Sequence, residues 1–191
     1  MFIGIDPGKT GGIVGITDQG NIAFKYATPV IGKEIDWGMF AEILREPGTH
    51  DRANIFIEHV HAMHNVAAGT TFTFGGCFEG AKALCAAFRL PYVLVAPKKW
   101  QAVMWDGVPE HRKPPKKLTK KELKAKAAGE KVRTPKAIGS VDTKVMSLIA
   151  ATRLFPGDSF LPTTTVKPNK PHDGIVDALL IAEYGRRLLN G

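Results

Sequence analysis

Four carboxylates stand at places in the sequence where acidic side chains are unusual. Asp6 follows an apolar run at the start of the chain, and Glu58 follows a second apolar run. Asp173 and Asp177 lie four residues apart near the end of the chain, so one face of a helix would present both. Hard divalent cations prefer oxygen ligands, and paired ions can activate water for attack on a phosphodiester. The four residues therefore predict a divalent-metal site.

Each of these acids also has a structural explanation. Asp6 precedes Pro7-Gly8 and could simply begin a turn. Asp173 could cap a helix or occupy its first turn, where the helix dipole favours a negative charge. Asp177 precedes a strongly apolar stretch, and Glu58 follows Ile-Phe-Ile, so neither is easily explained as a surface residue. Taken together, the four acids favour a functional site over four independent structural roles.

The elements that would carry these acids follow from the apolar pattern. The first thirty residues predict three antiparallel strands, and later apolar runs predict two more strands. Segments in which apolar residues recur at helical spacing alternate with these runs. The order predicts a single α/β domain over residues 1–191, with a mixed sheet and helices on both faces. The predicted strands are 2–5, 13–16, 22–26, 55–57 and 91–95, and the predicted helices are 37–44, 75–89, a short one after Pro97, 141–154 and 172–189.

Positive charge is concentrated in one segment of the chain. Residues 111–136 contain eleven Lys or Arg and two Glu, a local charge of +9 within a total of +8. A solvated face is one explanation, but a run of a single sign favours contact with a polyanion. We expect a flexible basic insertion at about residues 106–138. Its candidate DNA-binding residues are Lys116, Lys117, Lys120 and Lys121.

The remaining composition excludes several classes of protein. Cys77 and Cys85 would lie about 12 Å apart on a helix, beyond disulfide reach, and no Cys-x-x-Cys motif is present. No apolar run reaches the length of about 18 residues that a membrane span needs. The N-terminus lacks the pattern of a signal peptide. We therefore expect a cytoplasmic protein that has no contact with a membrane.

Aromatic residues give weaker signals. Trp37, Trp100 and Trp105 are expected in the core or at its rim. Phe72 and Phe74 lie in a segment that is typical of a loop leading into a helix. Their rings could stack on unpaired bases or pack in the core.

Several of these motifs together resemble one known family. The stretch Gly4-Ile5-Asp6-Pro7-Gly8-Lys9-Thr10-Gly11 resembles the first-strand motif of RuvC-type Holliday junction resolvases, which belong to the RNase H-like superfamily. Ile57-Glu58 resembles their second motif, and residues 95–100 resemble the strand-Pro stretch that follows. Residues 172–179 resemble their closing motif and are most similar to phage-type members.

The resemblance implies an RNase H-like fold and a metal-dependent endonuclease that hydrolyses four-way DNA junctions. It implies that Asp6, Glu58, Asp173 and Asp177 bind two Mg²⁺ ions, which Mn²⁺ can replace. It also implies a homodimer, branched DNA as the partner, and a role in DNA recombination and repair in a bacterial or phage-infected cell.

The sequence departs from the family pattern at several positions. Gly174 stands where bacterial members have an acid or His, and Asp173 is the phage-type substitute. Gln101 stands where the family often has Lys, so Lys98 or Lys99 could contact the scissile phosphate instead. His61 lies where bacterial members carry an aromatic residue that wedges into the junction. His61 and Lys9 complete the candidate DNA contacts.

Three other functions remain open. An actin-like ATPase begins with a similar Gly-Ile-Asp-x-Gly turn, but it needs two such domains to enclose a nucleotide. A non-catalytic junction-binding protein would not need the four acids. A broader nuclease for flaps and other branched DNA would use the same acids, and the sequence does not separate it from a strict junction resolvase.

Overall fold

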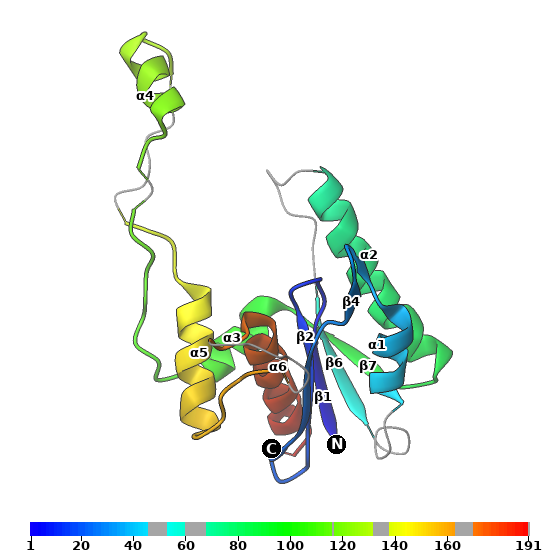
Figure 1. Cartoon of the computed structure of the whole chain (residues 1–191). Helices are drawn as coiled ribbons and strands as arrows, with labels where there is room; N and C mark the ends of the chain where they lie inside the picture. Colours follow the sequence, from blue (N-terminus) through cyan, green and yellow to red (C-terminus); the bar gives the residue numbers. More distant parts are fainter. Residues whose placement is uncertain (46–52, 60–67, 116, 132–137, 163–169, 191) are drawn as a thin grey trace.

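A five-stranded mixed sheet lies at the centre of the computed structural model, which describes residues 1–45, 53–59, 68–115, 117–131, 138–162 and 170–190 (Figure 1). The strand order is β3-β2-β1-β6-β7. β2 pairs antiparallel with β1 and β3, whereas β1, β6 and β7 are parallel. The predicted mixed sheet is thus confirmed. The strands are β1 (Phe2–Asp6), β2 (Gly12–Ile16), β3 (Ile22–Ala27), β6 (Asn54–Glu58) and β7 (Tyr92–Val95).

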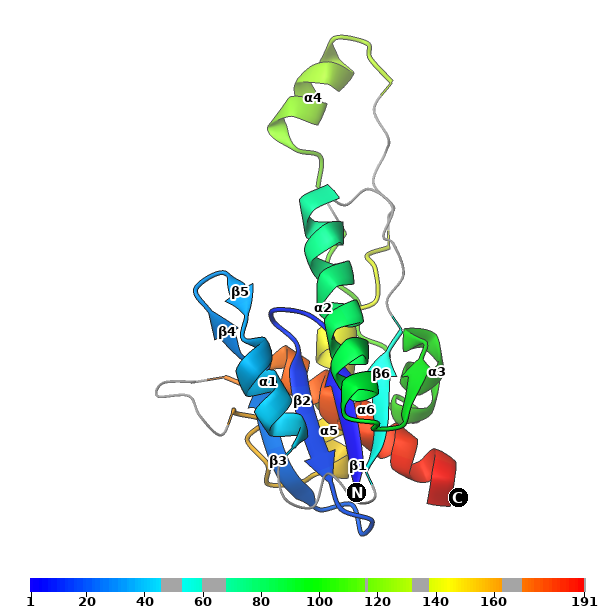
Figure 2. The same cartoon turned by 90° about the vertical axis from the view of Figure 1, so that its right-hand side faces the viewer.

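Two apolar cores lie on opposite faces of this sheet. Successive residues of a strand point to opposite faces, so Phe56 enters one core while Ile55 and Ile57 enter the other. α3, α5 and α6 cover the first face, and α1 and α2 cover the second (Figure 2). Helices therefore flank the sheet on both sides, as predicted. Their bounds are α1 (Trp37–Leu44), α2 (Ala68–Ala87), α3 (Pro97–Met104), α5 (Thr143–Leu154) and α6 (Asp173–Asn190).

Three elements differ from the sequence-based expectation. α2 begins at Ala68 rather than near residue 75, although its Gly- and Thr-rich first turns have low helix propensity. A small hairpin of β4 (Val30–Ile31) and β5 (Glu34–Ile35) was not predicted, because two-residue strands are too short to show alternation. The helix α4 (Lys120–Ala127) lies inside the basic segment. It was not predicted, because prolines flank it and its lysine-rich sequence has no apolar face.

The two cysteines are buried, and none of the described helices is a candidate membrane span. Cys77 and Cys85 both lie on α2 and are buried free thiols. Burial raises the pKa of the Cys85 thiol to about 12, so this group stays protonated at neutral pH. In the described ranges, no helix has both the length and the apolar character that crossing a bilayer requires.

Candidate active site

Two of the predicted acids end neighbouring parallel strands. Ile5 of β1 pairs with Ile57 of β6, so Asp6 and Glu58 follow at the same edge of the sheet. The residues just before each acid are buried, and the acidic residue that ends each strand is partly buried. The parallel pairing places both acids at the same edge of the sheet.

The helix α6 brings a third acid to this edge. α6 crosses β1 so closely that a Cβ on Gly4 would lie 1.9 Å from the carbonyl oxygen of Ala178. Asp177, the residue before Ala178, is thereby held against the end of β1. Burial raises the pKa of Asp6 well above its usual range, and the charges of Glu58 and Asp177 raise it further. We call Asp6, Glu58 and Asp177 the acidic cluster.

A close backbone contact explains the unusual spacing of the fourth acid. A Cβ on Gly174 would lie 2.4 Å from the carbonyl oxygen of Thr10 and 2.4 Å from the carbonyl carbon of Gly11. No side chain fits there, so this chain cannot carry an acid three residues before Asp177. Asp173, one residue earlier, is free of this contact.

Asp173 is set apart from the other three acids. Its side chain is 53% exposed and forms an ion pair with Lys144 of α5. The capping position before α6 belongs to His172, whose Nδ1 accepts a hydrogen bond from the backbone N–H of Ile175 at 3.3 Å. Asp173 is therefore a first-turn residue rather than the helix cap, and of the two structural alternatives only the first-turn role remains.

Asp177 carries a buried carboxylate oxygen without a partner. Its Oδ1 is fully shielded from solvent and has no hydrogen-bond partner, and the same is true of the nearby Ser147 hydroxyl. Burial raises the pKa of Asp177 to about 7, helped by the charges of Glu58 and Asp173. The Ser147 hydroxyl lies close enough to lower this pKa by hydrogen bonding, although the two groups form no bond of normal geometry, and the Lys144 charge lowers it too; neither cancels the rise. Such an oxygen is costly to bury unless something binds it.

Glu58 is held by a neighbouring tryptophan. The indole Nε1–H of Trp100 donates a hydrogen bond to Glu58 Oε1 at 2.9 Å. Burial raises the pKa of Glu58, and the Trp100 bond lowers it in part. Trp100 is 1% exposed and packs edge-on against Trp105. The position of one Glu58 oxygen is thus fixed by a rigid core residue.

The donor set suits a divalent cation, although the side chains do not yet enclose one. In their present conformations, no three or more His, Cys, Asp or Glu side chains of the described ranges form a group that could hold a metal ion. The acidic cluster nevertheless supplies only oxygen donors, the preference of Mg²⁺, and includes the unpartnered oxygen of Asp177. The residues therefore fit such an ion once their side chains rotate toward one another.

The predicted basic contacts are placed on different elements. Lys98 and Lys99 are exposed on the first turn of α3, which follows β7. Lys9 lies in the β1–β2 turn, where its Nζ donates to the Lys33 carbonyl oxygen and lies 3.8 Å from Glu34. Lys117, Lys120 and Lys121 lie on or beside α4. His61 and Lys116 fall outside the described residues.

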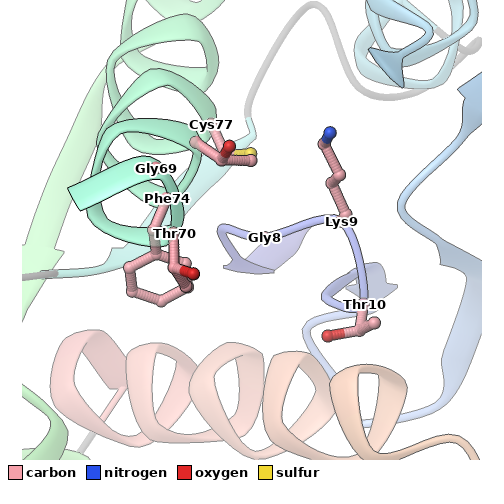
Figure 3. A pocket seen from close by; sticks show the side chains of 8 residues that line it. Gly8, Lys9, Thr10, Gly69, Thr70, Phe74 and Cys77 are labelled. Carbon is pink, nitrogen blue, oxygen red and sulfur yellow. The ribbon is translucent and has the colours of Figure 1, made fainter. Parts of the chain in front are cut away.

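A pocket opens beside the acidic cluster, between the β1–β2 turn and the first turns of α2 (Figure 3). Its volume is about 350 Å³, and Lys9 faces Phe74 and Cys77 across it. Phe74 packs against Gly8, whereas Phe72 is 84% exposed. Of the two aromatic residues that the sequence left open, only Phe74 is therefore packed against the fold.

Three residues of the site were not identified from the sequence. Lys144 and Ser147 lie on α5, far from every motif, and only the packing of α5 against α6 brings them to the acids. Trp100 lies in the strand-Pro stretch but was interpreted only as a core or rim residue. A buried indole near an acid-ending strand could have suggested a hydrogen bond.

The fold is similar to that of proteins of known structure. Thermus thermophilus RuvC in complex with a Holliday junction substrate matches with a TM-score of 0.55 and 11% identity, over 97% of this chain and 94% of that chain. Another Thermus thermophilus RuvC structure matches over 97% and 95% of the two chains, with a TM-score of 0.44 and 15% identity. No protein-family model and no curated protein sequence matches the chain. The chain has the RNase H-like α/β fold of RuvC.

Proposed function

We propose that this chain is a metal-dependent endonuclease that cuts branched DNA, with four-way junctions as its preferred substrate. The observation that carries the proposal is the acidic cluster, in which two strand ends and one helix bring three carboxylates to one edge of the sheet. The RuvC-like fold supports it, because that neighbour is bound to a Holliday junction substrate. The closing motif around Asp173 and Asp177 supports a kinship with phage-type members.

Each acid would offer different oxygen atoms to the metal. The charges of Glu58 and then Asp177 raise the pKa of Asp6, so all three carboxylates interact, and the unbonded Oδ1 of Asp177 is available as a ligand. Trp100 occupies Oε1 of Glu58, which leaves Oε2 for the metal. Asp173 can join them only if it leaves Lys144. Two bound Mg²⁺ ions, or Mn²⁺ in their place, would supply Lewis acidity and an activated water.

Nearby cations would neutralise the phosphate backbone. Lys98 and Lys99 are exposed beside the strand that neighbours β6, and Lys144 already stands next to Asp173. Lys9 lies on the opposite side of the acidic cluster, in the wall of the pocket. Charge-assisted contacts of this kind position the substrate without reading its sequence. We also propose a homodimer, because symmetric cutting of a junction needs two sites related by a two-fold axis.

The test compares DNA structures directly. The protein is incubated with Mg²⁺ and with a labelled four-way junction, a flap, a linear duplex and a single strand of the same sequence. We expect cutting of the junction above the others, and nicks with 5′-phosphate and 3′-hydroxyl ends that ligase can seal. Asp6→Asn should abolish the cutting, whereas Glu79→Gln, an exposed acid on α2, should not.

The other outcomes identify the alternatives. Equal cutting of flap and junction would indicate a broader branched-DNA nuclease. Junction binding without cutting in either Mg²⁺ or Mn²⁺ would contradict the proposed activity and support a binding protein that uses the same fold.

A further inference from the structure

The basic segment forms an arm that extends away from the rest of the chain. We define the arm as residues 109–115, 117–131 and 138–141, between α3 and α5, with α4 at its tip. None of its described residues is buried, and α4 contacts no other helix or strand closely. Both views show α4 standing clear of the sheet and its covering helices (Figures 1 and 2). The arm therefore contributes nothing to either apolar core.

The base of the arm is nevertheless an ordered structure. Its two ends run antiparallel, with a bridge between Arg112 and Val141. The Lys113 N–H donates to the Ser140 carbonyl oxygen at 2.9 Å. The Arg112 guanidinium donates to the carbonyl oxygen of Gly139 at 3.0 Å. These bonds fix the direction in which the arm leaves the domain.

The tip of the arm is stabilised by its own sequence. Thr119 and Glu122 form a capping box, in which Glu122 Oε2 accepts from the Thr119 N–H at 2.7 Å and Thr119 Oγ1 accepts from the Glu122 N–H at 3.3 Å. Lys124 and Lys126 lie in the last turn, where a positive charge suits the helix dipole. A helix of eight residues without core contacts is only marginally stable by itself. The capping box and the lysines of the last turn therefore contribute to its stability.

The described lysines of the arm carry positive charge that no ion pair among the described residues neutralises. Glu110 is paired with Arg112 at 2.6 Å, and Glu122 is held in the capping box. Among the described residues, none of the arm lysines forms an ion pair. Exposed, unpaired lysines on a projecting helix are suited to a polyanion. The arm lysines that the structure describes are Lys113, Lys117, Lys120, Lys121, Lys124, Lys126 and Lys131.

The arm extends beyond the edge of the sheet that carries the acidic cluster. β1 and β6 end at Asp6 and Glu58, and α4 stands beyond that edge in both views (Figures 1 and 2). The first turns of α2 extend beyond the same edge. A duplex with one phosphate at the acidic cluster can therefore continue toward the arm.

From these observations we propose that the arm is a second DNA-binding surface, separate from the cleavage site, which holds the backbone of a duplex branch of the same substrate. This proposal rests on the proposed function for its choice of polyanion. Contacts to phosphates give affinity without sequence preference. The arm should therefore bind linear duplex and junction branches alike, while the choice of junction is left to the rest of the protein.

Binding is measured in EDTA, so that the result does not depend on cleavage. The test variant carries Lys117→Ala, Lys120→Ala, Lys121→Ala and Lys124→Ala, which replace four exposed side chains of the arm. The control variant carries Lys82→Ala and Arg89→Ala, on and just after α2. Fluorescence anisotropy follows a labelled duplex and a labelled four-way junction over a series of salt concentrations. Unchanged circular dichroism and melting temperature show that each variant is folded.

We expect the arm variant to bind both DNAs at least about tenfold more weakly. The slope of log K against log[salt] should fall by about 0.9 for each lost phosphate contact, or roughly 3 to 4 for four contacts. The control should stay within about twofold of the wild type. An unchanged salt slope in the arm variant, or an equal loss in the control, would overturn the proposal. Failure of the protein to cut any DNA would overturn the proposed activity and leave this binding result intact.

Discussion

Replacement of Asp177 by Asn should make the metal-free protein more stable at neutral and alkaline pH. The Asp177 carboxylate has a buried oxygen without a hydrogen-bond partner, and the charges of Glu58 and Asp173 oppose its ionisation. Burial, with these charges, raises its pKa to about 7. An uncharged amide of nearly the same shape removes the buried charge without opening a cavity.

The sign of the effect follows from proton binding. In the folded state Asp177 holds its proton up to about pH 7, whereas the same group in the unfolded chain loses its proton near pH 3.8. The folded state therefore binds more protons between these values, and the free energy of unfolding falls as pH rises through this window. Below this window Asp177 is protonated in both states and does not lower the free energy of unfolding. Above the window it lowers the free energy of unfolding by a constant amount.

The size of the effect follows from the same two values. A difference of about three pKa units corresponds to roughly 4 kcal/mol over the whole window. Between pH 5 and pH 8 the expected loss is about 2 to 3 kcal/mol, because part of the window lies below pH 5. The free energy of unfolding of Asp177→Asn should not show this fall between pH 5 and pH 8.

Urea unfolding in EDTA at pH 5 and pH 8 measures the effect. The informative quantity is the stability difference between variant and wild type at pH 5, compared with the same difference at pH 8. This comparison cancels the titrating groups that do not interact with Asp177. Glu79→Gln is the control, since Glu79 is an exposed acid on α2 that pairs with Lys82 and has no part in the acidic cluster. Addition of Mg²⁺ at pH 8 should raise the melting temperature of the wild type and not that of Asp177→Asn. Parallel pH dependence of Asp177→Asn and wild type, within about 0.5 kcal/mol, would refute the argument.

Three further predictions concern the proposed reaction. Asp6→Asn and Glu58→Gln should each lower the junction-cutting rate at least about 10²-fold while junction affinity in EDTA is kept, and wild-type rates would remove these residues from the site. Asp173→Asn should slow cutting less than Asp177→Asn, because Asp173 is exposed and already paired; the reverse order in single-turnover rates would contradict this. Trp100→Phe, which keeps an aromatic side chain but loses the indole N–H that bonds to Glu58, should raise the Mg²⁺ concentration needed for half-maximal rate and for thermal stabilisation. Trp105→Phe is its control, because the Trp105 indole N–H is buried without a partner.

Much of the fold could be predicted because it depends on local apolar patterns. The runs ending at Asp6 and Glu58 have the unbroken apolar character of strands covered on both faces, and both strands are present. α5 and α6 also lie within a few residues of their predicted bounds. The first turns of α2 were missed because Gly and Thr dominate them, and α4 was missed because its lysines show no apolar face.

The candidate site could be predicted only in part. Asp6, Glu58 and Asp177 share one edge of the sheet because parallel strands and a crossing helix converge there. The separation of Asp173 from them depends on Lys144, which is 29 residues distant in sequence. The Trp100 hydrogen bond likewise joins residues 42 positions apart. Such pairings arise from packing, which periodicity within one element does not describe.

The contact of α6 with the sheet also restricts how a distant relative of this chain can vary. Beside Gly4 and Gly174, Gly12 belongs to the same contact, because a Cβ on Gly12 would lie 2.6 Å from the carbonyl oxygen of Gly174. A larger residue at any one of the three would separate the helix from the strands and move Asp177 away from Asp6. Relatives whose helix packs this closely should keep glycine at these three positions, whereas members with an acid or His at the position of Gly174 must hold the helix farther from the β1–β2 turn. The three glycines, with their spacing to the acids, therefore distinguish relatives that share this close packing from those that share the acids alone.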